Sequence, residues 1–304
     1  MALRLGSRGS ALAVAQATFV RERLEAVGED VEVVTIRTSG DERPGGGPAA
    51  DMGDKARFVK EIEDALLGGA IDLAVHSAKD VPGELPEGLA IVGVPERADA
   101  RDALCGAASI DDLAEGDVVG TASLRRRAQL LALRPELDVR DVRGNVDTRL
   151  RRLAEGDYDA LVLAAAGLAR LRRDEGEPIP EDAMTPAPGQ GCLALEARSD
   201  DPGTASLAAT LTDRGSLVML TAERALVTAL EATCRTPVGA YARLAGSKLT
   251  LEAFAGMSDG SHWIRDSGSG DPEDPAALGR AVGERMLAAG ARDLLEAAEG
   301  AGEG

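Results

Sequence analysis

The stretch F-V-K-E-I-E-D-A-L-L-G-G-A-I-D-L-A-V-H-S-A-K-D-V-P, residues 58–82, decides the fold. Apolar residues recur every four positions from Phe58 to Leu66, which predicts an amphipathic helix over Lys55 to Leu67 that ends at the two glycines. The apolar run from Ile71 to His76 predicts a buried strand. A helix followed directly by a buried strand is typical of an α/β sheet.

The same alternation extends in both directions. Val31 to Arg37 predicts a strand, and an apolar stripe after Ser10, a plausible N-cap, predicts a helix. From about Asp99 to Met184 strands again alternate with helices, among them Ser123 to Leu133 and Val146 to Ala154. We therefore expect two α/β blocks with mostly parallel sheets.

The rest of the chain has a different pattern. Asp174 to Gly191 is rich in proline and glycine and predicts a crossover. In the last block, about 214–304, Lys248 to Phe254 alternates like a half-exposed strand and Ala276 to Ala298 predicts one long amphipathic helix. This block is expected to be a small α+β domain. The glycine-rich stretch Pro44 to Asp54 predicts a mobile loop.

Composition excludes several classes of function. The 304 residues carry a net charge of −18 and only six aromatic side chains, which argues against binding to nucleic acid or to an anionic membrane. No apolar run is long enough for a transmembrane helix or a signal peptide, so we expect a cytoplasmic protein. The excess of carboxylates suggests a surface adapted to high salt, that is, a halophilic protein. A high-GC genome is the alternative explanation for the abundant alanine, glycine and arginine.

The cysteines and histidines argue against a metal site. Three cysteines without a C-x-x-C motif form neither a disulfide framework nor a zinc site, and two histidines are too few for a histidine-rich centre. Cys105 and Cys192 lie in apolar runs and are expected to be structural. Cys234 lies beside Arg235 near a helix end, where a thiol can be reactive, although a buried inert cysteine is statistically more common.

Three junctions between a strand and a helix carry arginine with glycine or a small hydroxyl residue. They are S-R-G-S at 7–10, G-T-A-S-L-R-R at 120–126 and R-G-N-V-D-T-R at 143–149. Free backbone N–H groups at a helix start favour anions, and guanidinium groups suit carboxylates. One such junction alone is equally well an ordinary N-cap with surface arginines. Three of them on an acidic protein predict a basic site for a polyanion.

The segment His76 to Pro82 places Lys79 and Asp80 side by side at the end of the buried strand. An exposed turn before a proline is the simple interpretation. The functional interpretation is an acid–base pair, in which Lys79 holds an anion while Asp80 stabilises a cation and moves a proton.

Taken together, these motifs resemble those of the porphobilinogen deaminase (hydroxymethylbilane synthase) family. The matching stretches are L-R-L-G-S-R-G-S-A-L-A (3–13), F-V-K-E-I-E (58–63), D-L-A-V-H-S-A-K-D-V-P (72–82), G-T-A-S-L-R-R (120–126), R-G-N-V-D-T-R-L (143–150), P-A-P-G-Q-G (186–191) and E-A-T-C-R-T-P-V-G (231–239). They follow the family's order across almost the whole chain.

The resemblance implies three domains. Residues 1–95 and 99–188 would form two α/β lobes like those of type II periplasmic binding proteins, and a segment near 192–210 would return to the first lobe. Residues 214–304 would form the α+β domain and carry Cys234 on a loop facing the cleft. Monomers are the family expectation.

The family's reaction implies a role for each site. Four porphobilinogen molecules lose ammonia and join into linear hydroxymethylbilane, a step in porphyrin and haem biosynthesis. The chain grows on a covalent dipyrromethane cofactor, whose thioether would be at Cys234, and Asp80 would be the catalytic carboxylate. The acetate and propionate groups of cofactor and substrate would bind the cationic and polar residues Arg8, Ser10, Lys55, Ser77, Lys79, Thr121, Ser123, Arg125, Arg126, Arg143, Arg149 and Arg170, with Gln190 near the crossover.

One stretch departs from the family pattern. Where many members have K-x-G-G-K-G, this chain has D-M-G-D-K-A at 51–56, so only Lys55 is kept. The role of residues 44–57 is therefore left open.

Two other functions explain part of the pattern. A two-lobed binding protein without catalysis would account for the arginine junctions, but neither for Cys234 in its loop nor for a third domain. A phosphoryl-transfer enzyme lacks support, because there is no G-x-x-x-x-G-K-[ST] motif and no carboxylate cluster suited to magnesium.

Overall fold

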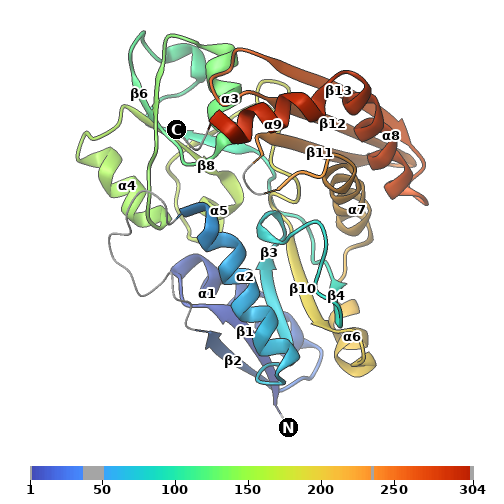
Figure 1. Ribbon diagram of the computed structural model, residues 1–304. Helices are drawn as coiled ribbons and strands as arrows, with labels where there is room; N and C mark the ends of the chain where they lie inside the picture. The colour runs from blue at the N-terminus through green and yellow to red at the C-terminus, as the bar shows by residue number, and fades with distance from the viewer. Residues whose placement is uncertain (1, 37–50, 234–235, 302–304) are drawn as a thin grey trace. The chain divides into compact units, whose positions relative to one another are not determined.

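The computed structural model describes residues 2–36, 51–233 and 236–301, and for residues 51–58 and 301 it describes the backbone alone. The chain divides into two compact units, residues 1–97 with 192–217, and residues 98–191 with 218–304 (Figure 1). Within the described ranges the strands form three sheets.

The first unit is built on one five-stranded sheet in the order β2-β1-β3-β10-β4. Its strands are β1 (Leu3–Arg8), β2 (Val31–Ile36), β3 (Leu73–Ser77), β4 (Leu89–Gly93) and β10 (Leu193–Arg198). β1 runs parallel to β2 and β3, whereas β10 is antiparallel to both of its neighbours. The carboxyl ends of β1 and β3 therefore meet at one edge of the sheet, and the short helix η1 (Ala78–Asp80) follows there.

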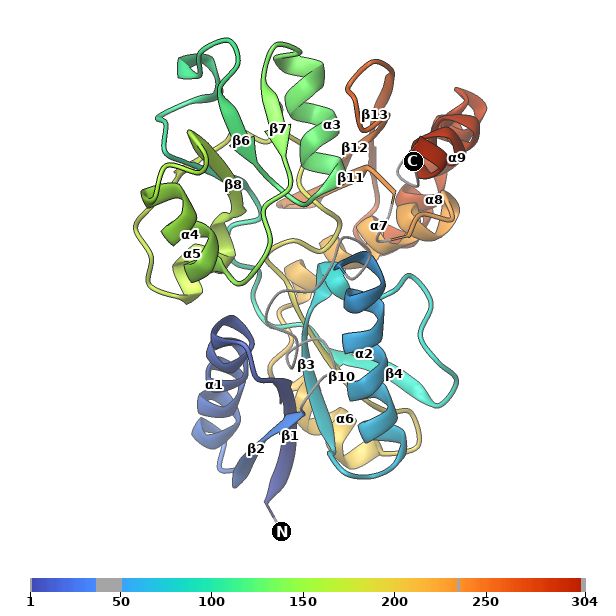
Figure 2. The same cartoon turned by 60° about the vertical axis from the view of Figure 1, so that its left-hand side comes forward.

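Helices cover both faces of this sheet, as Figure 2 shows for α1 and α2. α1 (Ala11–Ala26) and α6 (Pro202–Ala209) pack on the face that presents Leu73, Val75 and Leu195. α2 (Asp51–Leu67) packs on the opposite face, against Ala74. Residues 73 and 75 thus point away from residues 74 and 76, as alternation along a strand requires.

The second unit contains a similar sheet in the order β7-β6-β8-β5-β9. The strands are β5 (Asp102–Cys105), β6 (Val118–Gly120), β7 (Asp138–Arg140), β8 (Ala160–Ala164) and β9 (Glu177–Pro178), and the short helix η2 (Ile110–Asp112) lies between β5 and β6. β6, β7 and β8 are parallel, and each leads into a helix: α3 (Leu124–Leu133), α4 (Val146–Ala154) and α5 (Ala165–Arg170).

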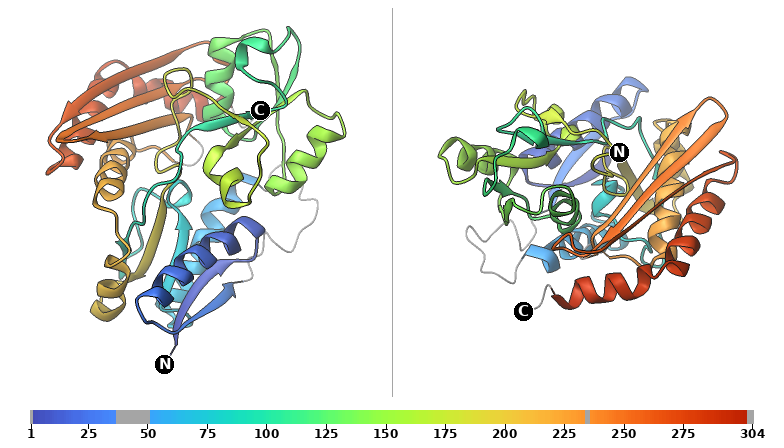
Figure 3. Two further views of the ribbon diagram at one scale, coloured as in Figure 1. Left: turned by 180° about the vertical axis from the view of Figure 1, so that it is seen from behind. Right: turned by 90° about the horizontal axis from the view of Figure 1, so that it is seen from above.

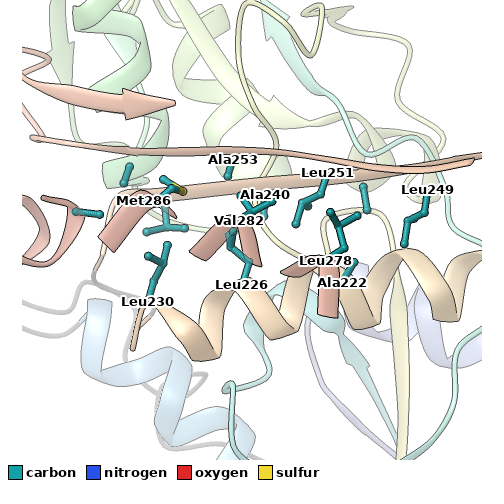
Figure 4. Packing of buried hydrophobic residues seen from close by; sticks show 14 of the residues in the cluster. Ala222, Leu226, Leu230, Ala240, Leu249, Leu251, Ala253, Leu278, Val282 and Met286 are labelled. Atoms are coloured by element: carbon teal, nitrogen blue, oxygen red, sulfur yellow. The ribbon is translucent and has the colours of Figure 1, made fainter. Parts of the chain in front are cut away.

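The third sheet is the antiparallel meander β11 (Val238–Ala245), β12 (Lys248–Gly256) and β13 (Trp263–Gly270). α7 (Arg214–Ala229), α8 (Pro275–Ala288) and α9 (Ala291–Ala301) cover one face, and α8 and α9 are seen in Figure 3. Leu226 of α7 and Val282 of α8 point into the core beneath Leu251 of β12 (Figure 4).

The α/β class is confirmed, with two corrections in detail. Half of the pairings in each five-stranded sheet are antiparallel, because β10 and β5 run against their neighbours. The single helix expected over Ala276 to Ala298 is two helices. Gly290 separates them with a φ of 96°, a left-handed conformation that ends α8.

Two smaller differences concern the first unit. α2 begins at Asp51, four residues before the expected start, and so includes the end of the stretch expected to be a loop. Residues 37–50, which hold the rest of that loop, lie outside the described residues. Within the described part of the chain, no helix combines the length and the apolar character needed to cross a bilayer.

Candidate active site

The first unit gathers five of the predicted site residues around one pocket. Arg8 ends β1, Ser10 caps α1 by accepting a hydrogen bond from the Ala13 N–H at 3.3 Å, and Ser77 ends β3. Lys79 and Asp80 follow in η1. The pocket has a volume of about 100 Å³ and is lined by Arg8, Ser10, Leu12, Ala13, Gln16, Val59, Ile62, Val75, His76, Ser77, Lys79 and Asp80.

The chemistry of this pocket suits an anionic ligand that develops positive charge. Arg8 and Lys79 are half-buried cations, and Asp80 is a half-buried carboxylate beside them. The turn that carries Asp80 is anchored to the residue just before β10, because the Ala78 N–H donates to the Cys192 carbonyl at 3.1 Å. The pocket can therefore hold carboxylates on its cations while one carboxylate faces the bound molecule.

In the second unit the predicted residues follow the parallel strands β6, β7 and β8. After β6, the Thr121 hydroxyl accepts from the Ser123 N–H at 3.2 Å, and Ser123 caps α3 by accepting from the Arg126 N–H at 3.4 Å. After β7, Arg143 precedes α4, and the Arg149 side chain donates to the Gly144 carbonyl at 2.7 Å. The three strands end at one edge of the sheet, so these groups share it.

Arg125 and Arg126 are buried rather than exposed at this edge. Arg125 Nη1 lies 2.8 Å from Asp102 Oδ2 and donates to the Thr185 carbonyl at 2.7 Å. Arg126 Nε donates to Asp102 Oδ1 at 2.9 Å, and its Nη1 donates to the Val162 carbonyl at 2.8 Å. Both guanidinium groups hold β5, β8 and the crossover together, and their binding to a ligand stays a prediction.

Asp102 is the centre of this network and was not singled out from the sequence. It also accepts a hydrogen bond from Gln190 Nε2 at 2.9 Å. Burial by itself would raise the pKa of Asp102, but the charges of Arg125 and Arg126 outweigh burial and hold that pKa well below its usual range. The sequence signal that could have indicated Asp102 is a carboxylate in the otherwise apolar strand D-A-L-C.

Gln190 lies in the crossover, and Arg170 contacts it from the end of α5. Gln190 is fully buried and also donates to the Ala100 carbonyl at 2.7 Å. Arg170, at the end of α5, donates to the Gly191 carbonyl at 2.7 Å. The buried Glu223 of α7 accepts from the N–H groups of Gly189 at 2.6 Å and Ala242 at 2.7 Å, and thereby joins the crossover to β11. Glu223 is the single acidic residue of helix α7, and this was the sequence signal that could have indicated its buried role.

Two predicted residues are not placed by the structure. Cys234 lies outside the described residues, and Lys55 lies in α2 where the side chain is not described. Cys105 and Cys192 are buried free thiols. Among the residues described, no group of three or more histidine, cysteine, aspartate or glutamate side chains could hold a metal ion.

The two five-stranded sheets, with a helix after each of their parallel strands β6, β7 and β8 and a pocket holding two cations and a carboxylate at the strand ends of the first unit, define the class as an α/β protein. Residues 3–206 match the family model described as porphobilinogen deaminase, dipyromethane cofactor binding domain, and residues 217–288 match the porphobilinogen deaminase C-terminal domain. The chain belongs to the porphobilinogen deaminase family, and the resemblance found in its motifs is confirmed.

Curated relatives match over nearly the full length. The porphobilinogen deaminase of Deinococcus deserti is 47% identical over 304 residues, covering 97% of this chain and 98% of the relative. That of Deinococcus radiodurans is 46% identical over 301 residues, covering 96% and 97%. Among solved structures, substrate binding domain 2 of Lactococcus lactis GlnP aligns with a TM-score of 0.42 at 12% identity, covering 69% of this chain and 86% of that one.

Proposed function

We propose that this chain deaminates porphobilinogen and joins four molecules of it into linear hydroxymethylbilane, as a transferase of tetrapyrrole biosynthesis. The observation that carries the proposal is the full-length match to the family together with the pocket that collects Arg8, Lys79 and Asp80. A binding protein without catalysis is not favoured, because the curated relatives are named as deaminases along their whole length.

The residues of the chain fit a dipyrromethane cofactor. Its acidic side chains match the half-buried cations and hydroxyl groups of the pocket in the first unit. When bound, the cofactor supplies the terminal pyrrole carbon to which the first substrate molecule is joined. We assign its attachment to Cys234, which lies in the family-like stretch E-A-T-C-R-T-P-V-G (231–239), whereas Cys105 and Cys192 are buried free thiols.

Binding of carboxylates is assigned to the cationic and hydroxyl residues at the strand ends. In the first unit these are Arg8, Ser10, Ser77 and Lys79, with Lys55 from α2. In the second unit they are Thr121, Ser123, Arg125, Arg126, Arg143, Arg149 and Arg170. The buried position of Gln190 supports a role in holding the crossover rather than the ligand.

Asp80 is assigned the catalytic role. Loss of ammonia from porphobilinogen leaves a cationic electrophile, and a carboxylate near the pyrrole N–H groups stabilises that charge. Lys79, the adjacent residue, holds a substrate carboxylate. The anchored turn of η1 keeps the Asp80 carboxylate at the pocket, so it needs no rearrangement during each addition.

The remaining assignments concern the whole protein. We assign three domains, residues 1–95 with about 192–210, 99–188 and 214–304, supported by the three sheets. We assign a monomeric enzyme of the cytoplasm, and the compartment is supported by the free thiols of Cys105 and Cys192. Adaptation to high salt is supported by the net charge of −18.

The intact mass of the denatured protein tests the cofactor assignment. Protein purified from cells that make tetrapyrroles is expected to carry two porphobilinogen units less their ammonias on the peptide that holds Cys234. Cys234→Ala should lack this adduct, and Cys105→Ala should keep it. A covalently bound pyrrole in Cys234→Ala would contradict the assignment.

Asp80→Asn tests the catalytic assignment. Because the amide keeps the shape but not the charge, the cofactor should remain attached while turnover falls by about 100-fold or more. Formation of hydroxymethylbilane from porphobilinogen is the measurement. Glu84→Gln, which removes an exposed carboxylate four residues further on, is the matched control and should keep its activity.

A further inference from the structure

Three titratable side chains from three elements are buried next to the pocket of the first unit. Glu63 of α2 is 5% exposed, His76 of β3 is 5% exposed and Glu196 of β10 is 1% exposed. None of them belongs to the residues assigned above. Ionisable groups buried to this degree are costly unless they are paired, so their presence calls for an explanation.

The sheet register brings them together. β3 and β10 are antiparallel neighbours, with Glu196 opposite Ala74 and Ala194 opposite His76. His76 and Glu196 are therefore diagonal neighbours on the face that α2 covers. His76 Nε2 lies 2.9 Å from Glu196 Oε2.

The cluster contains two carboxylates and one possible cation. Glu63 Oε1, His76 Nε2 and both carboxylate oxygens of Glu196 are buried and have no well-oriented hydrogen-bond partner among the described residues. His76 can compensate one carboxylate, and Glu196 is the one in contact with it. The second, Glu63, is then favoured in its neutral form. Burial, and next the charge of Glu196, indeed raise the pKa of Glu63.

Among the residues described, the other charged groups near the cluster do not add a further partner for Glu63 or Glu196. On α2, Lys60 and Asp64 are exposed and pair with each other at 3.1 Å. Arg8, Lys79 and Asp80 line the adjoining pocket, and β4 carries no charged residue. Within the described residues, the cluster is thus enclosed by apolar residues of α2 and the sheet on its other sides.

The cluster is connected to the catalytic turn in two ways. His76 itself lines the pocket that Asp80 lines. In addition, β10 pairs with β3 along its length, Glu196 of β10 contacts His76, and the carbonyl of Cys192, just before β10, accepts from the Ala78 N–H. The end of β3 and the start of η1, which carries Asp80, are therefore held by β10 and the residue before it.

We propose that Glu63, His76 and Glu196 form a positioning cluster for Asp80, in which Glu196 is the partner of His76 and Glu63 is the second buried carboxyl, for which the site favours the neutral form. The inference rests on the proposed function, since it assumes that Asp80 is catalytic. The charge on Glu196 fixes the imidazole at the pocket wall, and the neutral Glu63 lets α2 pack over it. A second charge at Glu63 would repel Glu196 and loosen this packing.

The two carboxylates should therefore respond differently to the same substitution. Glu63→Gln mimics the protonated acid and should keep kcat within about twofold. Glu196→Gln removes the charge that faces His76 and should lower kcat by about tenfold or more, with KM for porphobilinogen little changed and the pH profile of kcat displaced. Equal effects, or the reverse order, would overturn the proposal.

Controls separate positioning from simple loss of stability. Elsewhere in the same unit, Asp72 and Arg4 form an ion pair in which Asp72 Oδ1 lies 2.6 Å from Arg4 Nη2. Asp72→Asn breaks this ion pair. It should lower the melting temperature but leave kcat and its pH profile unchanged. Glu196→Asp, which keeps the charge on a shorter side chain, should recover part of the activity lost in Glu196→Gln. A pH profile of Glu196→Gln identical to that of the wild type would contradict the role.

A readout without turnover distinguishes this inference from the proposed function. The chain has two histidines, His76 and His262, and His262 is exposed. In protein with 15N-labelled histidine, Glu196→Gln should shift the His76 ring resonances and leave those of His262 in place. If the His76 resonances do not shift, the proposed cluster is wrong, even when the enzyme is active. If they shift in a protein that has neither the covalent adduct nor turnover, the cluster is correct and the proposed function is wrong.

Discussion

Both units bury carboxylates at their α/β sheets, and the two units compensate these charges differently. In the second unit one carboxylate, Asp102, faces two arginines and an amide. In the first unit two carboxylates, Glu63 and Glu196, share a single histidine. The first arrangement keeps its charges at any ordinary pH, whereas the second depends on where one proton lies.

The same contrast applies to the arginines of the two units. Arg8 is half-buried and lines a pocket, whereas Arg125 and Arg126 are buried on an internal carboxylate. Arg8 is the last residue of β1, and Arg125 and Arg126 come shortly after the end of β6. A cation at such a position therefore does not by itself show whether it faces a ligand or the protein core.

The largest effect is expected from Asp102→Asn. It leaves two buried guanidinium groups without their counter-charge, which should cost about 3–5 kcal/mol in the free energy of unfolding. Denaturant titration measures this. Asp99→Asn, at the exposed pair with Arg101, is the control and should cost about 0–1 kcal/mol. A small loss in Asp102→Asn would remove the difference drawn between the two sheets.

Glu63→Gln is expected to have a smaller effect, on the pH dependence of the free energy of unfolding. Because the pKa of Glu63 is raised in the folded protein, the folded state binds more protons than the unfolded state above the usual glutamate pKa. The contribution of Glu63 therefore decreases as pH rises through its folded pKa. Glu63→Gln should remove this decrease and be the more stable protein at neutral pH, as melting temperatures between pH 4 and 8 would show.

Asp72, in the same unit, makes stability depend on pH in the opposite direction. Its hydrogen bond with Arg4 lowers the pKa of Asp72, so its contribution is present at neutral pH and is lost as pH falls through the folded pKa. Asp72→Asn should therefore lose stability at neutral pH and approach the wild type in acid. If Glu63→Gln behaved in the same way, the proton assigned to Glu63 would be wrong.

The smallest effect concerns thiol reactivity in the second unit. Burial raises the pKa of Cys105 to about 11, so this thiol has little thiolate at pH 8. In the native protein, iodoacetamide should leave Cys105 unmodified over hours, and denaturant should expose it. Peptide mass spectrometry measures both. Rapid labelling of the native protein would show that the sheet around β5 opens more readily than its burial indicates.

Local patterns in the sequence were sufficient for much of the fold. The helix Val146–Ala154 begins and ends where predicted, and Ser10 caps a helix as expected, because these signals depend on neighbouring residues alone. The helix predicted from Ser123 begins one residue later, with Ser123 as its N-cap. The break at Gly290 was missed because the apolar period continues on both sides of it. β13 was also missed, since its Gly and Ser residues resemble a turn.

The parts of the site that could not be predicted depend on contacts between distant residues. Motifs pointed to Arg8, Lys79 and Asp80, and the structure brings them to one pocket. No local pattern shows that Arg126 meets Asp102, or that His76 meets Glu196 from a strand 120 residues away. Such pairs become visible only when the sheet register is known.

The antiparallel insertion of β10 also has a consequence during synthesis of the protein. β4 pairs with β10 alone in the described sheet, yet β10 follows roughly a hundred residues later. At the usual rate of translation, the nascent chain waits about 5 to 20 s between completing β4 and making its partner. During that interval β3 and β4 present unpaired strand edges, which other chains can join. The first unit of a ribosome-bound chain therefore needs protection from aggregation during that interval.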